Sequence, residues 1–392
     1  MKWATATIGE VCEVVSGATP KTGTPAFWDG DVPWVTPKDL SDNVQKYLTD
    51  TPRKITTAGL RSCSAKMLPA DSVLFSSRAP IGLVAINKIP VCTNQGFKNM
   101  VPRNGILSPD YLYWWLDIHR EDVQRLGRGA TFKEVSKKIV EDIQIPLPPL
   151  AEQKRIAVIL DAADGLRAKR RESLAQLDTL LQSTFLDMFG DPVTNPKGWR
   201  VVDFKEVGTS RLGKMLDKGK EAGNCQFPYL ANFNVQWGRF VLDDLRRMDF
   251  TEKDRKEFEL KDGDLLVCEG GEVGRTAIWR GEMKDVYFQK ALHRVRLNPS
   301  KSVPEYVQQC MWFMAKNGGF RDFTNSATIA HLTGVKLKTV PFPQPPLDLQ
   351  HRFATIVESI EQQKARLRSH LAELDTLFAS LQQRAFNGEL LP

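Results

Sequence analysis

Two acidic residues and a lysine in the first half of the chain have the types that could hold a metal ion. Asp142, followed by Glu152-Gln153-Lys154, imitates the acid–acid–Lys pattern that binds Mg²⁺ for phosphodiester cleavage. In such nucleases the Glu-x-Lys pair lies on a strand. Here the pair follows Pro148-Pro149 and opens a predicted helix, where an early glutamate suits the helix dipole. The pattern therefore supports a nuclease weakly.

Other catalytic motifs are missing from the sequence. A methyltransferase would need an Asn/Asp-Pro-Pro-aromatic loop, and its nearest matches, Leu147–Leu150 and Gln344–Leu347, lack both the first polar residue and the aromatic one. The chain has no GxxxxGK[ST] loop and no GxGxxG motif. The glycine cluster Gly270–Gly274 predicts a tight turn between strands rather than a phosphate cradle. We expect no catalytic residue, although a methyltransferase or nuclease with unrecognised motifs stays as the alternative.

The cysteines and the apolar runs limit the class of protein. None of the six cysteines has a CxxC spacing or a histidine nearby, so we expect reduced, mostly buried thiols and no metal site. No apolar run approaches the roughly 20 residues that span a bilayer. The N-terminus does not resemble a signal peptide, and we expect a cytoplasmic protein. These cysteines are Cys12, Cys63, Cys92, Cys225, Cys268 and Cys310.

The net charge of +7 is unevenly distributed. Residues 1–149 carry 18 basic and 15 acidic side chains, and residues 190–346 carry 25 and 20. Residues 150–189 balance six of each, and residues 347–392 carry five basic and six acidic side chains. An excess of basic charge in two separate regions favours a polyanionic partner, although a mildly basic protein without such a partner is the alternative.

The two nearly neutral segments have the pattern of long helices. Each follows a proline-rich stop, and Gly190 and Asn387-Gly388 supply the helix ends. Apolar residues recur at spacings of three and four, as in a coiled coil, although the two helices could also pack separately on their own domains. Arg167, Arg170 and Lys364 interrupt the stripes at matching places, and we expect this polar layer to fix the register. The stripes are Ile156, Leu160, Ala163, Leu174, Leu177, Leu181 and Met188, and Phe353, Val357, Ile360, Leu367, Leu371, Leu374, Phe378 and Leu381.

The helical segments belong to an internal repeat with an offset of about 197 residues. Pro148–Ala157 matches Pro345–Ala354, and Leu177–Leu180 matches Leu374–Leu377. The preceding regions match more loosely, as in Ala85-Ile86 and Ala277-Ile278. Their short β-branched runs predict strands of a mixed sheet, and 111–116 and 306–312 predict one buried helix in each. The fold class is therefore α/β (α+β), with two similar globular parts, two long helices and pseudo-twofold symmetry.

The whole chain resembles the specificity (S) subunit of type I restriction–modification systems. The segments that carry this resemblance are Pro148–Ile156, Leu177–Ser183, Phe189–Pro192 leading to Asn195–Trp199, Ser76–Gly82, Asn94–Gly96 and Ala385–Leu390. One departure is visible, because Leu349-Gln350-His351 stands where the first copy has Glu152-Gln153-Lys154. We therefore expect the two helix starts to engage their partners unequally.

The resemblance implies a non-catalytic subunit that gives a DNA adenine methyltransferase and restriction complex its sequence specificity. Residues 1–147 and 191–344 would be target-recognition domains, each reading half of an asymmetric bipartite site in double-stranded DNA. Residues 148–190 and 345–392 would form an antiparallel coiled coil that sets the gap and docks two methyltransferase subunits. Motor–nuclease restriction subunits would join them. S-adenosylmethionine, ATP and Mg²⁺ would bind those partners, and no cofactor is expected on this chain.

If the two basic domains grip a duplex, loops rich in Arg, Lys, Asn, Gln, Ser and Thr would read it, because these side chains match base edges in the major groove. For any single residue, a turn or capping role is the alternative to a base contact. The candidate segments are Thr19–Thr24, Thr36–Lys38, Ser76–Arg78, Asn94–Lys98, Arg125–Thr131, Asn232–Asn234, Arg239, Glu269–Arg275, Gln289-Lys290 and Asn325–Thr328. Within them we select Thr36, Lys38, Ser76, Ser77, Arg78, Asn94, Gln95, Lys98, Arg128, Asn232, Asn234, Arg239, Arg275, Gln289, Lys290 and Asn325.

Overall fold

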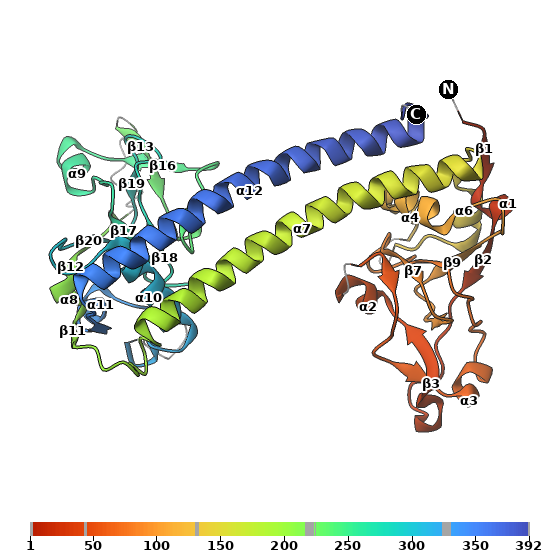
Figure 1. The fold of residues 1–392 in the computed structure, drawn as a ribbon, viewed down its shortest axis with the longest axis horizontal. Helices are drawn as coiled ribbons and strands as arrows, with labels where there is room; N and C mark the ends of the chain where they lie inside the picture. Colours follow the sequence, from red (N-terminus) through yellow and green to blue (C-terminus); the bar gives the residue numbers. More distant parts are fainter. Residues whose placement is uncertain are drawn as a thin grey trace. The chain divides into compact units, whose positions relative to one another are not determined.

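A computed structural model of the chain describes residues 3–42, 45–129, 133–215, 223, 225–323 and 331–390. The chain divides into two compact units (Figure 1), unit 1 with Met1–Arg171 and Ser369–Pro392 and unit 2 with Glu172–Arg368. Both boundaries fall inside long helices, so each unit combines a globular domain with half of each helix. Within the described ranges, no helix is long and apolar enough to cross a membrane.

The globular domain of unit 1 is built on a five-stranded sheet of order β2-β9-β6-β7-β4. A second, three-stranded sheet has the order β5-β3-β8, and β1 pairs with β10. The elements are β1 (Thr5–Thr7), α1 (Ile8–Val11), β2 (Cys12–Ser16), β3 (Trp28–Val35), α2 (Pro37–Asp42), β4 (Tyr47–Leu48), β5 (Lys54–Ile55), α3 (Thr57–Arg61), β6 (Val73–Phe75), β7 (Val84–Asn87), β8 (Cys92–Thr93), β9 (Lys98–Pro102), α4 (Pro109–Ile118), α5 (Arg120–Arg125), α6 (Lys137–Asp142) and β10 (Gln144–Pro146).

Unit 2 repeats this plan with a four-stranded sheet of order β12-β20-β17-β18 and a three-stranded sheet of order β16-β13-β19. Here β11 pairs with β21, and β14 and β15 form a hairpin. The elements are β11 (Val201–Asp203), α8 (Phe204–Val207), β12 (Gly208–Leu212), β13 (Gln226–Leu230), β14 (Val235–Gln236), β15 (Arg239–Phe240), β16 (Arg246–Asp249), α9 (Glu252–Glu257), β17 (Leu265–Cys268), β18 (Thr276–Ile278), β19 (Tyr287–Phe288), β20 (Leu292–Leu297), α10 (Pro304–Lys316), α11 (Gly334–Lys338) and β21 (Pro341–Pro343).

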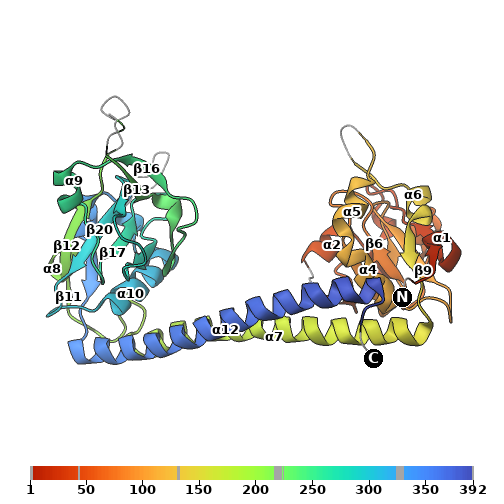
Figure 2. The same cartoon turned by 90° about the horizontal axis from the view of Figure 1, so that it is seen from above.

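The strand registers confirm the predicted fold class and the repeat. In unit 1, Leu74 of β6 lies opposite Ala85 of β7, and in unit 2, Leu266 of β17 lies opposite Ala277 of β18. The predicted buried helices are α4 and α10 (Figure 2), and Tyr111 and Tyr306 are 0% and 1% exposed. One strand breaks the match, because β4 extends the first sheet beyond β7.

The two long helices, α7 (Leu150–Phe189) and α12 (Leu347–Asn387), begin and end where the sequence predicts. Two prolines precede each helix, and Pro cannot donate the backbone hydrogen bonds that a longer helix would need. Gly190 and Gly388 follow with φ of +77° and +74°, a left-handed conformation that glycine adopts without a Cβ clash. The prolines and glycines therefore delimit both helices.

Within each unit the two helices pack against each other in opposite directions. In unit 1, the Arg155 guanidinium donates to the Leu390 carbonyl, and Arg167 contacts Asp375. In unit 2, Asp178 contacts Lys364, and the rings of Phe185 and Phe353 lie 5.5 Å apart. All the stripe residues are buried or half-buried, as the helical periodicity predicts.

The polar layer consists of two ion-pair clusters related by the repeat. Arg167 Nε lies 2.6 Å from Asp375, and Arg167 also pairs with Asp164 at 2.7 Å. Lys364 Nζ lies 2.6 Å from Asp178 and 2.7 Å from Glu361. An offset of 197 residues converts each residue of the first cluster into its counterpart in the second. Each helix therefore supplies the cation in one unit and the cross-helix acid in the other.

A buried glutamine in the first turn fastens each long helix to its globular domain. Gln153 is fully buried, accepts from Ser108 N at 2.8 Å and donates to the carbonyls of Ile106 and Pro148, both at 2.9 Å. Gln350 is equally buried, accepts from the Ser302 hydroxyl at 2.8 Å and donates to Pro345 O at 2.9 Å. The shared glutamine of the two helix starts therefore has a structural role, and the differing neighbours Lys154 and His351 are exposed.

Candidate nucleic-acid interface

The loops at one edge of unit 1 gather most of the residues predicted for that domain. Strands β3 and β8 are parallel, so their carboxyl ends meet at the same edge of the sheet. A depression of about 450 Å³ lies there, with the buried Trp34 in its wall. Four of the five candidate segments of this domain contribute to its lining through Thr19, Thr36, Lys38, Arg78, Asn94 and Gln95.

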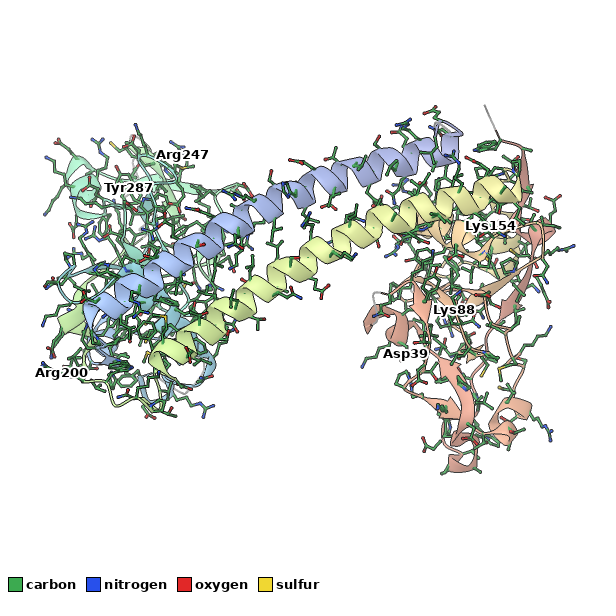
Figure 3. The ribbon with its side chains drawn as sticks, in the orientation of Figure 1. Asp39, Lys88, Lys154, Arg200, Arg247 and Tyr287 are labelled. Carbon is green, nitrogen blue, oxygen red and sulfur yellow. The ribbon has the colours of Figure 1, made fainter. Side chains whose placement is uncertain are left out.

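Thr36 has an internal role rather than the predicted contact with DNA. Its side chain is 5% exposed, and its N–H and hydroxyl both donate to Asp39 Oδ2, at 2.6 and 2.8 Å (Figure 3). Arg53 donates to the Thr36 hydroxyl at 2.9 Å, and its guanidinium lies 5.2 Å from the centre of the Trp34 ring. Thr36 therefore positions Arg53, a lining residue that is not among the predicted ones because no motif surrounds it.

The two serines before Arg78 are a second correction, because both are fully buried. The Ser76 hydroxyl donates to Pro80 O at 2.7 Å and accepts from Leu83 N at 2.8 Å. The Ser77 hydroxyl donates to Gly96 O at 3.1 Å. Buried backbone groups need such partners, so these hydroxyls hold the turn that presents Arg78 and are not available to DNA.

Arg78 and Lys98 share the carboxylate of Glu134. Lys98 Nζ lies 3.0 Å from Glu134 and is 11% exposed, whereas Arg78 lies 3.9 Å from the same carboxylate and is 35% exposed. Lys98 is therefore an internal ion-pair partner rather than the predicted DNA contact. Arg78 can turn toward an approaching phosphate or base, and Arg128, which pairs through its backbone with Glu134, is exposed beside it.

The remaining polar groups of this edge face solvent. Asn94 Oδ1 accepts from Gly96 N at 2.9 Å, an arrangement that leaves its amide group to the depression. Gln95 is exposed and accepts from the Thr19 hydroxyl, and Lys38 is exposed at the start of α2. Lys38, Arg78, Asn94, Gln95 and Arg128 are therefore the predicted residues of unit 1 that a duplex can reach. The part of Arg125–Thr131 beyond residue 129 lies outside the described residues.

The equivalent edge of unit 2 is formed by the ends of the parallel strands β13 and β19 and by the β17–β18 turn. Asn232 donates to Gly270 O at 2.9 Å and accepts from Arg275 at its backbone carbonyl, also at 2.9 Å. Arg275 is 15% exposed, so its guanidinium fastens this edge and the predicted DNA contact is not supported. Gly271 and Gly274 have φ of +73° and +79°, which confirms the predicted tight turn.

The predicted DNA contact of Asn234 is not supported either, because the residue is 1% exposed. Its side chain accepts from Ala231 N and donates to Val241 O. Lys290 is exposed, and Gln289 is half-buried. Arg239 is exposed, but it lines a groove beside the long helices rather than this edge. Asn325 and the segment Asn325–Thr328 lie outside the described residues.

An exposed aromatic residue and an arginine complete this edge. The aromatic residue lies inside the predicted segment Asn232–Asn234 but is not among the selected residues, and the arginine lies outside every predicted segment. Phe233 is 46% exposed, and the Arg246 guanidinium lies 5.0 Å from the centre of its ring. Arg247, which follows on the same edge strand, donates to Gln226 O at 2.8 Å (Figure 3). The adjacent pair Arg246-Arg247 was a usable signal, because two charges in a row on a strand place one on each face.

The acidic residues that suggested a nuclease are each held in an ion pair within their own helix. Asp142 pairs with Lys138 at 2.6 Å, and Glu152 pairs with Arg155 at 2.7 Å. The hydrogen bond from Arg155 holds the pKa of Glu152 below its usual value. Among the described residues, no group of three His, Cys, Asp or Glu side chains could hold a metal ion. Four cysteines are buried, and burial raises the pKa of the Cys12 and Cys92 thiols to about 12, so they stay protonated.

Comparisons with known proteins converge on one family. A family model described as "Type I restriction modification DNA specificity domain" matches residues 1–177 and again 196–374. The MjaIX specificity subunit of Methanocaldococcus jannaschii is 35% identical over 60% of this chain, and the match spans 57% of that relative's length. The EcoKI specificity subunit of Escherichia coli K12 is 24% identical over 99% of this chain and 89% of its own. A chain from a structural study of assembly of the type I R-M system has a TM-score of 0.63, 20% identity and coverage of 99% and 98%.

Proposed function

The chain belongs to the type I restriction modification DNA specificity family, and on this basis we propose that it is the non-catalytic DNA-specificity subunit of a type I restriction–modification complex. Each unit would read one half of a bipartite double-stranded DNA site. The observation that carries the proposal is the repeated edge, where parallel strand ends in both units present exposed basic side chains. Basic charge concentrated in the two globular regions would supply affinity for the phosphates.

The two edges present different chemistry, which supports an asymmetric site. Unit 1 offers Lys38, Arg78 and Gln95, whereas unit 2 offers Phe233, Arg246 and Lys290. An arginine or glutamine can form paired hydrogen bonds with a purine in the major groove, and an exposed phenylalanine ring suits a thymine methyl or a stacked base. A palindromic methylated motif would contradict the proposal that the two edges read different half-sites.

The proposal assigns catalysis to partner subunits in the cytoplasm. Two methyltransferase subunits would use S-adenosylmethionine, and motor–nuclease subunits would use ATP and Mg²⁺. The test incubates the purified chain with DNA, labelled S-adenosylmethionine and Mg²⁺, with and without the methyltransferase subunits. We expect methylation only when those subunits are present. Methylation or cutting by the chain alone would favour the alternative, an enzyme with unrecognised motifs.

The residue-level test uses Arg78 and a matched control. Arg78→Ala should weaken binding to the specific site by about 1–3 kcal/mol and relax specificity at one position, because a bidentate base contact is lost. Lys88→Ala is the control, because Lys88 is an exposed cation at the opposite end of β7 that pairs with Asp71 (Figure 3). Equal losses for both variants in a salt-controlled binding assay would show that Arg78 provides charge alone.

We also propose that the long helices set the gap between the half-sites. Inserting Thr-Ala-Glu-Leu after Leu177 adds about 6 Å of helix and nearly one full turn, so the facing of the stripe is roughly kept. Sequencing of methylated DNA should then show the same two half-sequences with a gap longer by one or two base pairs. Methylation at the original gap alone by a folded variant would show that the helices do not set the spacing.

A further inference from the structure

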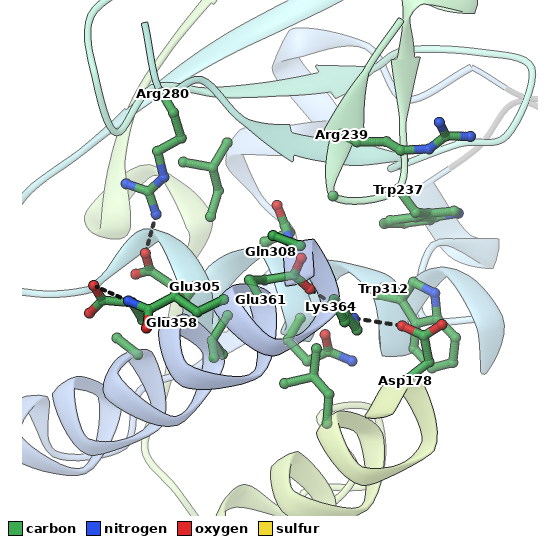
Figure 4. Close-up of a pocket in the computed structure, with 18 of the residues that line it drawn as sticks. Asp178, Trp237, Arg239, Arg280, Glu305, Gln308, Trp312, Glu358, Glu361 and Lys364 are labelled. Atoms are coloured by element: carbon green, nitrogen blue, oxygen red, sulfur yellow. Dashed lines mark hydrogen bonds and ion pairs between the residues drawn. The ribbon is translucent and has the colours of Figure 1, made fainter. Parts of the chain in front are cut away.

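Unit 2 contains a groove of about 1070 Å³ that plays no part in the edge described above (Figure 4). It lies between α10, the hairpin β14–β15, and the parts of α7 and α12 that belong to unit 2. Trp237 and Trp312 line one end of it, and Arg280, Glu305 and Glu358 line the other. The groove therefore combines aromatic surface with charged groups.

The same place in unit 1 is filled by the chain itself. Lys46, just before β4, reaches between two helices and contacts Asp110 of α4 at 2.7 Å and Asp161 of α7 at 2.6 Å. Its ammonium group also lies 5.4 and 5.5 Å from the ring centres of Tyr113 and Trp114. The side chain is 12% exposed, so Lys46 closes the space between the globular domain and the long helix.

The acidic groups that hold Lys46 have counterparts in unit 2. Asp110 follows Pro109 at the start of α4, and Glu305 follows Pro304 at the start of α10. Asp161 lies 197 residues before Glu358, the offset of the helix repeat. Both Glu305 and Glu358 line the groove. Unit 2 therefore keeps both acidic positions, whereas the hairpin β14–β15, which lies against β18 as β4 lies against β7, contains no lysine.

Smaller side chains leave this space open. Gln308 and Gln309 of α10 occupy the positions of Tyr113 and Trp114 of α4. In unit 1, β4 pairs in parallel with β7 at Ile86, whereas in unit 2 the hairpin β14–β15 lies against β18, and Gly238 N–H in its turn donates to Thr276 O at 3.1 Å. Ile278, the β18 counterpart of Ile86, lines the groove. The hairpin therefore covers part of the β18 edge without bringing a lysine to the groove.

The charges of the groove do not suit a nucleic acid. Its lining carries five carboxylates and four basic side chains, so it lacks the basic excess that holds a polyanion. Arg280 already pairs with Glu305 and also contacts Asp262 at 3.6 Å. For Glu358 no ion pair is found among the described residues, where its carboxylate accepts from Gln362 at 3.4 Å. Glu358 thus lacks the cation that Asp161 has in unit 1.

We propose that this groove of unit 2 binds a segment of a partner protein, which places a lysine or arginine against Glu358. The cation would reproduce what Lys46 provides internally in unit 1. The two tryptophans supply apolar contact area for the residues beside the cation. The identity of the partner rests on the proposed function, which makes the methyltransferase subunit the candidate to test.

The test places a benzophenone-bearing amino acid at Gln308 of the full chain, assembles it with the methyltransferase subunits and irradiates the complex. We expect a crosslink to one segment of the methyltransferase that contains a lysine or arginine. The same amino acid at Asp187, an exposed residue of α7 outside the groove lining, is the control site and should give no such crosslink. Assembly and methylation without a crosslink from Gln308 would overturn the inference and leave the proposed function intact. A crosslink to a second copy of this chain would overturn it too.

Charge reversal gives the second part of the test. Glu358→Lys should lower the affinity for the methyltransferase at least about tenfold, whereas Asp187→Lys, the same charge change outside the groove, should alter it less than about twofold. Changing the basic residue of the crosslinked segment to glutamate should restore binding to the Glu358→Lys chain. Equal losses for both lysine variants, or no restoration, would overturn the inference. If the wild-type chain does not assemble with the methyltransferase at all, the proposed function fails and the inference fails with it.

Discussion

In unit 1 and in unit 2, the globular domain is joined to a long helix through the same buried glutamine, a connection called the glutamine joint below. The space beside this joint is filled in unit 1 and open in unit 2. Gln153 and Gln350 bond to equivalent backbone groups, and Tyr111 and Tyr306 each donate to a proline carbonyl at 2.9 Å. Beside this joint, Lys46 closes unit 1, whereas unit 2 has a groove. Both units therefore keep the same bonds where the helix meets the domain, while the space beside these bonds differs.

The largest expected effect comes from removing the shared glutamine. Gln153→Ala should lower the unfolding free energy of unit 1 by about 3 kcal/mol, because it leaves buried backbone donors and acceptors without partners. Gln350→Ala should do the same to unit 2. Hydrogen–deuterium exchange resolved by unit measures both. Lys154→Ala and His351→Ala alter exposed neighbours and are the controls, and equal effects in variants and controls would refute the shared joint.

A change at Lys46 should make unit 1 resemble unit 2. Lys46→Met leaves the carboxylates of Asp110 and Asp161 close together without their cation, which should cost about 2 kcal/mol after allowance for their partial exposure. Protection from hydrogen exchange should fall in α4 and the adjoining part of α7. Lys88→Met, which removes a more exposed ion pair with Asp71, should cost less than about 0.5 kcal/mol. A smaller loss at Lys46 than at Lys88 would contradict this account.

The two cross-helix clusters should respond unequally although the repeat relates them. Lys364 is 5% exposed and Arg167 is 19% exposed, and Arg167 also lies 4.2 Å from the centre of the Phe378 ring. Asp178→Ala should therefore cost about 1 kcal/mol and Asp375→Ala less than about 0.5 kcal/mol. Thermal unfolding of the two variants measures the difference. A larger loss for Asp375→Ala would show that burial does not decide the strength of these pairs.

The smallest effect concerns pH and unit 2. His293 is 1% exposed and bonds to Leu332 O at 3.0 Å, and burial lowers the pKa of its imidazole below the ordinary value of 6.5. The unfolded chain therefore binds a proton that the folded chain resists, so stability falls as pH decreases through about 6.5. Exchange protection of unit 2 between pH 7.5 and 5.5 should show this loss, and His293→Gln should reduce it. The exposed His351→Gln should leave the dependence unchanged.

Much of the fold was predictable because it rests on covalent and periodic features. Paired prolines and glycines delimit α7 and α12, and the apolar spacing identifies their buried faces. The 197-residue offset also identified Lys364 as the repeat counterpart of Arg167. The sequence did not reveal that Asp375 and Asp178 are their partners, because a charge pattern on one helix does not show which charge of another helix it meets.

The DNA-facing edge was predictable as a set of segments and much less so as residues. Thr36, Ser76, Ser77 and Asn234 have the right chemistry for base contacts, but turns with buried backbone groups require the same hydroxyls and amides. Lys98 is held by Glu134, which lies 36 residues away in the sequence. A polar side chain in a loop is expected to form a hydrogen bond, but the sequence does not show whether the partner lies within the protein or on DNA. Only the three-dimensional structure distinguishes these two cases.

The glutamine joint has a consequence for inheritance and engineering. Because each domain ends at the same proline-proline-leucine start and the same glutamine contacts, either domain should be transplantable onto either helix as a cassette. A recombination event within these repeated segments would exchange a whole reading surface and leave every bond of the joint with an equivalent partner. New combinations of half-sites could then arise by shuffling intact modules, without a destabilised intermediate sequence.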